Sequence, residues 1–375
     1  MQFLTRRILL AVCVAIFSIS LVIDAKEKRT RNLFLIRVDK KAGYIDRTGK
    51  VAIKPIYEDA EDFSEGLAPV KIDAKWGFID ESGQMVIEPR FDWIYWAGFS
   101  EGIVPAGINK KVGAIDRQGK FVIDPIYEMA REFSDGLMPV KFPGKQWDYS
   151  WIYVDAVGRK AIDREFFGAD SFVNGRAFVK VGFDEWALID KTGNQVTKQH
   201  FGSKDSFNIF SEGLTAVKVK KKWGYIDRDG KFIIKPQFDD AENFSEGLAA
   251  VRVGCNYGYI DKRGNLVISA NFETAWKFSN GLAPVALAVR STRGLRYKSN
   301  GRWIQSCGLG VGSFEPQGYI DRTGKIVIEP IFGRAFIFNN GIAQVSFGEP
   351  PDVIGAIGKR GYIDKTGKYI WEPTQ

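Results

Sequence analysis

The feature that most constrains the fold is a phrase of roughly 35 residues that the chain repeats about nine times. One copy runs from Gly43-Tyr44-Ile45-Asp46 to Glu65-Gly66-Leu67-Ala68, and the closest later copy ends at Glu246-Gly247-Leu248-Ala249. A fixed period of this length indicates a repeat architecture, in which neighbouring units complete one another's core. The aspartate after the apolar triplet marks the register and recurs at Asp46, Asp80, Asp116, Asp155, Asp190, Asp227, Asp261, Asp321 and Asp364.

Each copy is predicted to be a three-stranded meander. In one copy the expected strands cover residues 67–72, 76–79 and 85–87, and Pro89 is expected to end the third strand because it lacks a ladder N–H. The turn before the third strand reads Asp-x-x-Gly, where the aspartate can cap the turn and the glycine supplies a positive φ. We therefore interpret the recurring aspartates as turn residues rather than catalytic or calcium-binding groups. The recurring glycine, Gly77 in this copy, is expected where another backbone approaches closely.

The period predicts an all-β fold made of tandem three-stranded meanders. The expected arrangement is an open superhelical, solenoid-like stack, and a closed β-propeller is the alternative, because blades of three or four strands have similar periods. The array covers residues 33–373, about eight repeats plus a terminal half-repeat, with an insertion at 286–316. The half-repeat could cap a stack or complete a ring.

Two copies begin with a Lys-Trp-Gly motif, in Lys75-Trp76-Gly77-Phe78-Ile79-Asp80 and Lys222-Trp223-Gly224-Tyr225-Ile226-Asp227. On these residues the chain resembles the WG (KWG) β-repeat protein family. The resemblance implies a β-rich, mostly bacterial protein that binds or scaffolds, and it carries over no catalytic residue. Several copies depart from the motif and have another residue in place of the tryptophan, namely Val112, Tyr257, Gln317 and Arg360.

The N-terminus has the pattern of a targeting segment. Two arginines precede an apolar-to-small run at residues 8–23, which is short for a membrane span of about 20 residues. We interpret residues 1–25 as a signal peptide or N-terminal anchor and 26–32 as a short linker, and we favour cleavage after Ala25 over retention. Either way the repeats are expected outside the cytoplasm, secreted or periplasmic, with residues 8–23 as a membrane anchor if the segment is retained.

The cysteines fit an exported protein. Cleavage would remove Cys13 and leave Cys255 and Cys307, which both lie in the connection between the first and second strands, in successive copies. Equivalent connections of adjacent repeats lie side by side, and an oxidising compartment favours bridging. The sequence therefore predicts a disulfide between Cys255 and Cys307.

Three long insertions fall in this same connection, which places them along one edge of the array. Insertions on one face often form a binding face, although tolerated loop drift explains them equally well. Aromatic rings beside cations suit sugars or anionic polymers, but the basic connections could also simply be neutralised by acidic ones. The candidate ligand-binding residues on this edge are Trp147, Tyr149, Trp151, Arg293, Arg296, Tyr297 and Trp303.

Conventional catalytic groups are scarce. His200 is the only histidine, and with two mature cysteines this excludes a His/Cys zinc cluster and makes a Ser-His-Asp triad depend on one residue. The sequence has no P-loop, no GxGxxG after a strand and no HExxH. We predict no catalytic, cofactor-binding or metal-binding residues and no cofactor. A carboxylate-dependent glycan hydrolase is the least favoured alternative, since no acid stands out from the repeat.

These observations favour an extracytoplasmic binding or interaction scaffold. The expected partner is a protein or a cell-envelope polymer, and the alternative is a module that binds a polysaccharide or an anionic polymer. No nucleic acid partner is predicted. Contact with a membrane is expected only through an uncleaved N-terminal segment.

Overall fold

The computed structural model describes residues 32–144, 151–183, 185–202, 209–288, 296–299, 302–305, 316–347 and 359–374. These residues form strands and turns, arranged as small antiparallel sheets, and the described ranges contain no helix. The prediction of an all-β fold is therefore confirmed. Within the same ranges there is consequently no helix long and apolar enough to cross a membrane.

Each sheet of the repeat array is built around first and second strands of the repeat. The first strands are β1 (Phe34–Val38), β5 (Leu67–Ile72), β9 (Ile103–Ile108), β13 (Met138–Lys141), β16 (Arg176–Lys180), β18 (Leu214–Val219), β22 (Ala249–Val253), β25 (Leu282–Leu287) and β31 (Ile342–Phe347). The second strands are β2 (Lys41–Ile45), β6 (Lys75–Asp80), β10 (Lys111–Asp116), β14 (Trp151–Val154), β17 (Trp186–Asp190), β19 (Lys222–Asp227), β23 (Asn256–Ile260), β28 (Gln317–Asp321) and β32 (Lys359–Asp364).

Third strands and short inner strands flank this pair. The third strands are β3 (Val51–Tyr57), β7 (Met85–Phe91), β11 (Phe121–Tyr127), β20 (Phe232–Phe238), β24 (Leu266–Ala275), β29 (Ile326–Phe332) and β33 (Tyr369–Thr374). The inner strands, which the sequence did not predict, are β4 (Asp59–Ala60), β8 (Trp93–Ile94), β12 (Met129–Ala130), β15 (Gly168–Ala169), β21 (Asp240–Ala241) and β30 (Arg334–Ala335). A separate hairpin consists of β26 (Arg296–Ser299) and β27 (Arg302–Gln305).

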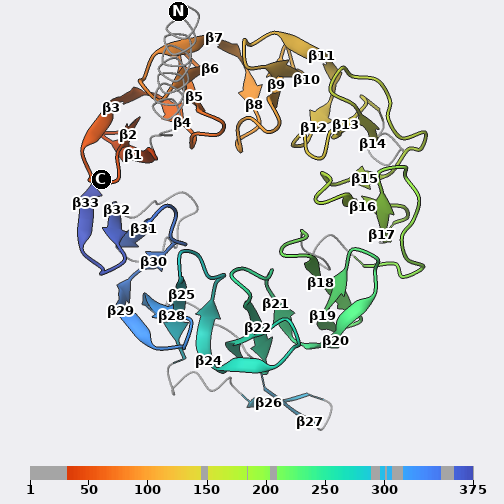
Figure 1. Ribbon diagram of the computed structural model, residues 1–375, viewed down its shortest axis with the longest axis vertical. Coiled ribbons are helices and arrows are strands. Elements are labelled where there is room, and N and C mark those ends of the chain that lie inside the picture. The colour runs from red at the N-terminus through yellow and green to blue at the C-terminus, as the bar shows by residue number, and fades with distance from the viewer. Residues whose placement is uncertain are drawn as a thin grey trace, which may run out of the picture.

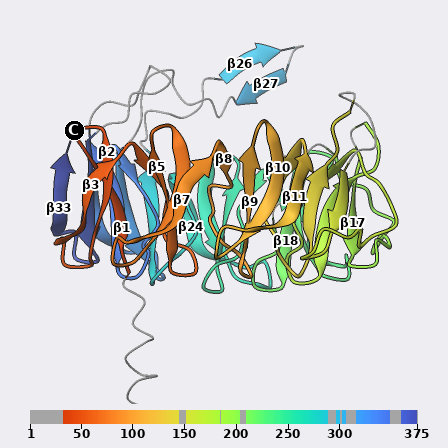
Figure 2. The same ribbon diagram turned by 90° about the horizontal axis from the view of Figure 1, so that it is seen from above.

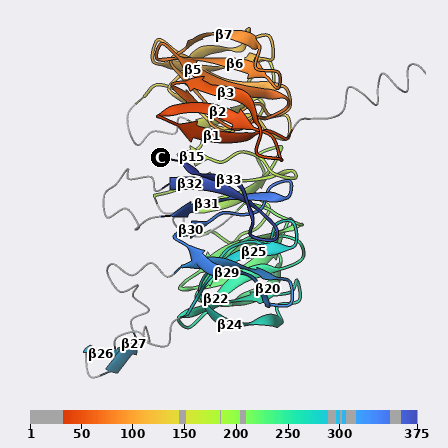
Figure 3. The same cartoon turned by 90° about the vertical axis from the view of Figure 1, so that its left-hand side faces the viewer.

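The sheets follow one another around a ring with an open centre (Figure 1). In a complete sheet the order is β4-β5-β6-β7, so the inner strand faces the centre and the third strand lies at the periphery. The connections between first and second strands lie on one face of the ring, here called the insertion face. The β26–β27 hairpin belongs to such a connection and projects beyond this face (Figures 2 and 3).

The sequence predicted that the third strand ends at its proline, and this prediction is wrong. The strand β7 continues through Pro89 to Phe91, but the pairing shifts from Trp76↔Phe91 to Phe78↔Ile87, which leaves a bulge opposite Gly77. Proline is tolerated there because a bulge does not require its ladder N–H. A Cβ on Gly77 would lie 2.4 Å from the carbonyl oxygen of Ile87, so the close backbone approach expected at this glycine is present.

The Asp-x-x-Gly segments are turns, as predicted. At Asp321, Oδ1 accepts hydrogen bonds from the backbone N–H groups of Thr323 and Lys325 and from the Thr323 hydroxyl, and Gly324 has a φ of +87°. The hydrogen bond from the Thr323 hydroxyl is the main reason that the pKa of Asp321 is lowered. Backbone contacts of the same kind occur at all nine aspartates, so this carboxylate has a structural task in every repeat.

The core lies between successive sheets, where a ring on the second strand meets the next inner segment. The term inner segment means an inner strand together with the residues that lead from it into the first strand. The Tyr225 ring lies 4.8 Å from the Phe244 ring, and the Tyr225 hydroxyl donates a 2.8 Å hydrogen bond to the Glu242 carbonyl. Since Tyr225 is fully buried, this bond satisfies a hydroxyl that would otherwise be costly to bury.

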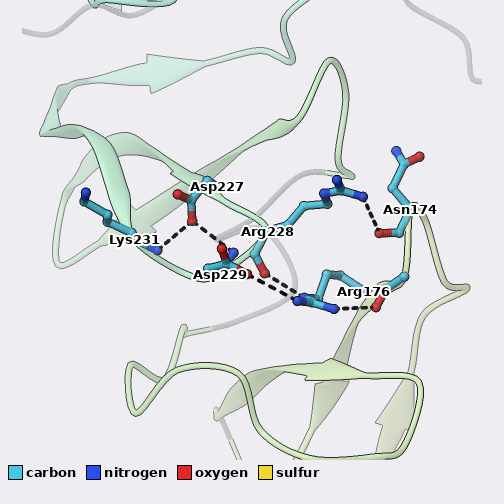
Figure 4. A network of polar contacts seen from close by, with 7 residues as sticks. Asn174, Arg176, Asp227, Arg228, Asp229 and Lys231 are labelled. Atoms are coloured by element: carbon cyan, nitrogen blue, oxygen red, sulfur yellow. Dashed lines mark hydrogen bonds and ion pairs between the residues drawn. The ribbon is translucent and has the colours of Figure 1, made fainter.

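Turns on the opposite face connect neighbouring sheets through arginines. The Arg176 Nε donates a 2.6 Å hydrogen bond to the carbonyl of Arg228, and the Arg228 Nη1 donates a 3.2 Å bond back to the carbonyl of Asn174 (Figure 4). An ion pair of 3.4 Å joins Arg176 to Asp229. Arg117 and Glu65 form an equivalent contact at 3.6 Å between two other sheets.

The two ends of the repeat array are in contact, with first-strand residues in place of the inner-segment partners found between internal sheets. The Tyr362 hydroxyl donates a 2.7 Å hydrogen bond to the Leu35 carbonyl, and the Tyr362 and Phe34 rings lie 5.8 Å apart. On the turn face, Asn340 Nδ2 donates to Asn32 Oδ1 at 3.1 Å. The terminal half-repeat supplies the second and third strands of the last sheet, β30-β31-β32-β33, which lies beside the first sheet.

Candidate functional site

The ligand-binding residues predicted on the insertion edge are only partly described. Arg296, Tyr297 and Trp303 come together in the β26–β27 hairpin, where Trp303 pairs with Lys298, but the structure describes only the backbone pairing of these residues. Three further candidates lie outside the described residues, namely Trp147, Tyr149 and Arg293.

Trp151 lies elsewhere. It belongs to β14, in a different part of the ring from the hairpin (Figure 1). Its side chain is buried in an intersheet core, and the Arg131 guanidinium lies 5.4 Å from the ring centre. Trp151 is therefore a core residue whose ring the protein itself covers, and the hairpin residues remain a prediction.

Two described lysines near the insertion face, Lys75 and Lys222, are paired with acids. Lys222 Nζ donates a 2.6 Å hydrogen bond to Asp239, whose other oxygen accepts a 2.8 Å bond from the Gly254 backbone. The side chains of Lys75 and Asp92 make the same contact in another sheet. These pairs favour the alternative interpretation in which acidic and basic connections neutralise one another.

The predicted disulfide falls partly outside the described residues. Cys255 lies in the turn between β22 and β23, on the insertion face, whereas Cys307 lies outside the described ranges. The pairing of these two cysteines stays a prediction.

A different site emerges at the centre of the ring. The inner strand β8 pairs with β9, and only Ile94 of that strand is buried against the core. Trp93 keeps 40% of its surface exposed, and Trp96, just after the strand, keeps 67%. Tyr95 is half-buried between them, with its ring 6.4 Å from Trp93 and 5.8 Å from Trp96. We call Trp93, Tyr95 and Trp96 the aromatic patch.

The aromatic patch is flanked by charged groups from the next two sheets. Arg131 forms a 3.4 Å ion pair with Asp170, and burial together with the nearby Glu132 carboxylate raises the pKa of Tyr95. Burial also raises the pKa of Glu132 itself. The patch therefore combines exposed apolar rings with a paired arginine and an acid that is partly removed from water.

This arrangement suits binding. Scattered exposed apolar residues are normal, but neighbouring exposed rings rimmed by polar groups mark interaction sites, and Trp, Tyr and Arg are the residues that dominate interface energies. The described residues hold no group of three His, Cys, Asp or Glu side chains that could bind a metal ion.

The sequence contains a signal for this site in the inner segment of one copy. At the positions of the aromatic patch and Ile94, another copy has the acidic and small residues Asp59-Ala60-Glu61-Asp62. A position-by-position comparison of the copies shows that in one inner segment three aromatic residues replace three acidic ones. The insertions are more conspicuous in the sequence, and they lie on the insertion face.

Comparison with known families identifies the repeat. The family described as "WG containing repeat" matches at residues 43–76, 76–111, 113–145, 186–223, 223–254, 257–287 and 318–349. The chain belongs to this family. Membership of the WG-repeat family suggests a repeat-based interaction scaffold, and the family is not a known enzyme family. Among curated proteins, no match was found.

The fold was also compared with solved structures. The chain is similar to a structure titled "Crystal structure of the eukaryotic initiation factor", with 12% identity, a TM-score of 0.60, and coverage of 92% of this chain and 98% of that one. BamB from Moraxella catarrhalis follows with 13% identity, a TM-score of 0.41, and coverage of 69% and 92%. The WD40 β-propeller domain of Doa1 has 10% identity, a TM-score of 0.32, and coverage of 68% and 93%. At these identities the likeness concerns the fold alone.

Proposed function

We propose that this WG-repeat protein is an extracytoplasmic interaction scaffold that binds a partner protein at the centre of its ring. The observation that carries the proposal is the aromatic patch, where Trp93 on an inner strand and Trp96 just after it keep much of their surface exposed to water. Leaving these rings exposed has no stabilising role in the chain itself, whereas covering one tryptophan with a partner would remove a large apolar area from water.

A closed ring of the propeller type supports this role, and we propose it over the open stack. The contacts of Tyr362 with Leu35 and of Asn340 with Asn32 join the two ends of the array. A closed ring fixes the distance between the patch and the opposite wall, which preorganises a binding site. Small-angle scattering of the chain should give the profile of a flat disc, and an elongated particle would contradict closure.

The binding role can be tested with two tryptophan variants. The mature chain, immobilised, should retain a partner from the soluble and membrane fractions of its own envelope. We expect the double variant Trp93→Ala and Trp96→Ala to lose that partner and to stay folded by circular dichroism, with a small drop in melting temperature because Trp93 is partly covered by the protein. Trp276→Ala is the matched control, since it removes a ring of 44% exposure from the inner segment of another sheet. Equal retention by all three proteins would contradict the proposal.

A polysaccharide is the second candidate partner, because three adjacent aromatic rings can stack against the apolar faces of sugar rings. Incubating the same proteins with purified envelope polysaccharide separates the two candidates. A glycan-binding module should sediment together with protein-free polysaccharide, and replacing the patch should abolish this co-sedimentation. A protein scaffold should sediment only when the fraction also contains its partner protein.

The export of the chain is part of the same proposal and rests on the apolar run at residues 8–23. Fractionation of cells that produce the full chain checks it. The repeats should be accessible to protease added outside the cytoplasmic membrane, and protection of the repeats until the membrane is lysed would contradict the proposed location.

A further inference from the structure

The inner segments carry four carboxyl groups whose pKa is raised by burial, and these groups differ in the charges around them. They are Glu61, Asp62, Glu132 and Glu242. Arg37 lies near the first two and Lys277 lies near the last, and in each case the cation favours the ionised acid. Near Glu132 the charge that adds to the effect of burial is another acid, Glu101. Glu132 is therefore the exception among the inner acids.

The other charged groups around Glu132 are already engaged. The Glu101 carboxylate accepts hydrogen bonds of 2.8 and 2.9 Å from two backbone N–H groups in the turn that follows Glu132. Arg131 is held by the carboxylate of Asp170 at 3.4 Å. Within the part of the chain that the structure describes, the Glu132 carboxylate has no hydrogen-bond or ion-pair partner, and only its backbone carbonyl accepts a bond. The group thus leaves one negative charge without a counter-charge.

Glu132 lies beside the aromatic patch. It is the second residue after the inner strand β12, as Trp96 is the second residue after β8 in the preceding sheet. Burial and, after it, the Glu132 carboxylate raise the pKa of Tyr95, whose ring lies 5.8 Å from the Trp96 ring. Met129 of β12 adds an exposed apolar side chain next to this acid. The patch therefore has a carboxylate without a cation on the side of the next sheet (Figure 1).

Exposed aromatic rings beside such a carboxylate suit a cation. The face of an aromatic ring attracts a lysine or an arginine, and the planar guanidinium group of arginine also stacks on the ring. A carboxylate that a partner covers keeps its charge at low cost only when the partner brings a cation to it. A neutral or acidic side chain at this place would leave Glu132 covered and unpaired, which weakens binding.

We propose that the partner protein places a cationic side chain, an arginine or a lysine, on the aromatic patch, with its charge between the Tyr95 and Trp96 rings and the Glu132 carboxylate. The apolar stem of this side chain and an apolar neighbour in the partner cover Trp93 and Met129. This inference rests on the proposed function, because it names the chemistry that the same patch recognises.

Two labelled peptides that differ only in charge test the cation. One has the sequence Gly-Leu-Arg-Leu-Gly with both ends blocked, and in the other the arginine is replaced by citrulline, which has the same shape and no charge. In a fluorescence anisotropy titration, the mature chain should bind the arginine peptide about tenfold more tightly, the effect of one charge-assisted contact. Equal affinities, or no binding of the arginine peptide at millimolar concentrations, would overturn the proposal.

Variants of the full mature chain assign the contact to one carboxylate. Glu132→Gln keeps the size of the side chain and removes its charge, so it should weaken binding of the arginine peptide about tenfold and leave the citrulline peptide unaffected. Glu242→Gln is the matched control, because it removes an inner acid that already has Lys277 nearby, and it should change neither affinity. Unchanged binding of the arginine peptide by Glu132→Gln would overturn the assignment.

The same variants separate this inference from the proposed function. In the retention experiment with envelope fractions, Glu132→Gln should retain less of the partner than Glu242→Gln does. If the double variant of Trp93 and Trp96 loses the partner while Glu132→Gln retains it fully, the patch binds without a cation and only the present inference fails. If both of these proteins retain the partner as the unaltered chain does, the proposed function fails as well.

Discussion

Replacing Gly224 with alanine should destabilise the protein strongly, because the added Cβ has no space. It would lie 2.5 Å from the Ile234 carbonyl oxygen and 2.7 Å from the Pro236 nitrogen. Ordinary contacts of a Cβ begin at 3.4 Å, so the third strand must move by 3.4 − 2.5 = 0.9 Å. Overpacking of this kind costs about 1–3 kcal/mol, and loss of a ladder hydrogen bond adds about 1 kcal/mol. Alanine also lowers the conformational entropy of the unfolded chain, which offsets about 0.4–1 kcal/mol of the lost free energy of unfolding.

The net loss of about 2–3 kcal/mol should lower the melting temperature by about 3–4 °C, because the unfolding entropy of an array of this length is large. The melting temperature is measured by circular dichroism near 215 nm. Gly107→Ala is the control, because Gly107 also lies in a strand without a positive φ but a Cβ there would meet its nearest neighbours at 3.4 Å. This control should melt within about 2 °C of the unaltered protein. Equal melting temperatures for the two variants would refute the argument that the bulge selects glycine.

Three further predictions concern the contact between the first and last sheets, the Asp-x-x-Gly turns and the cysteines. Tyr362→Phe should lower the free energy of unfolding by about 1–1.5 kcal/mol. Tyr225→Phe, between internal sheets, should lower it by the same amount. In an open array, Tyr362→Phe would leave the free energy of unfolding unchanged. The pKa of Asp321 is lowered in the folded state, so its stabilisation is complete at neutral pH and is lost as the pH falls below about 4. The difference in melting temperature between the unaltered protein and Asp321→Ala should therefore shrink between pH 6 and pH 3, and a constant difference would disprove the link to ionisation. Mass spectrometry of unreduced peptides should show Cys255 joined to Cys307 in protein from its native compartment, and two free thiols there would rule the bridge out.

The aromatic patch shows why the candidate site escaped sequence analysis. The insertions were conspicuous because they interrupt the period, whereas Trp93 and Trp96 keep the period and differ only in residue type. Their importance depends on exposure at an innermost strand, and a two-residue strand such as β8 leaves no periodic pattern in the sequence. The reverse holds for Trp151, whose insertion neighbourhood suggested binding while its ring is part of the core.

The sequence by itself determined the repeat, its family, the all-β class and the three main strands of each unit. It could do so because each of these is local: a turn needs its Asp and Gly within four residues, and a strand needs its own apolar side chains. The same reasoning failed at Pro89, because the bulge that accommodates this proline is a property of two paired strands. Only the tertiary structure brought Tyr362 to Leu35, more than three hundred residues apart in the chain. The curvature that accumulates from sheet to sheet decides whether the ends meet, and a small rotation per repeat leaves no mark on any single copy of the sequence.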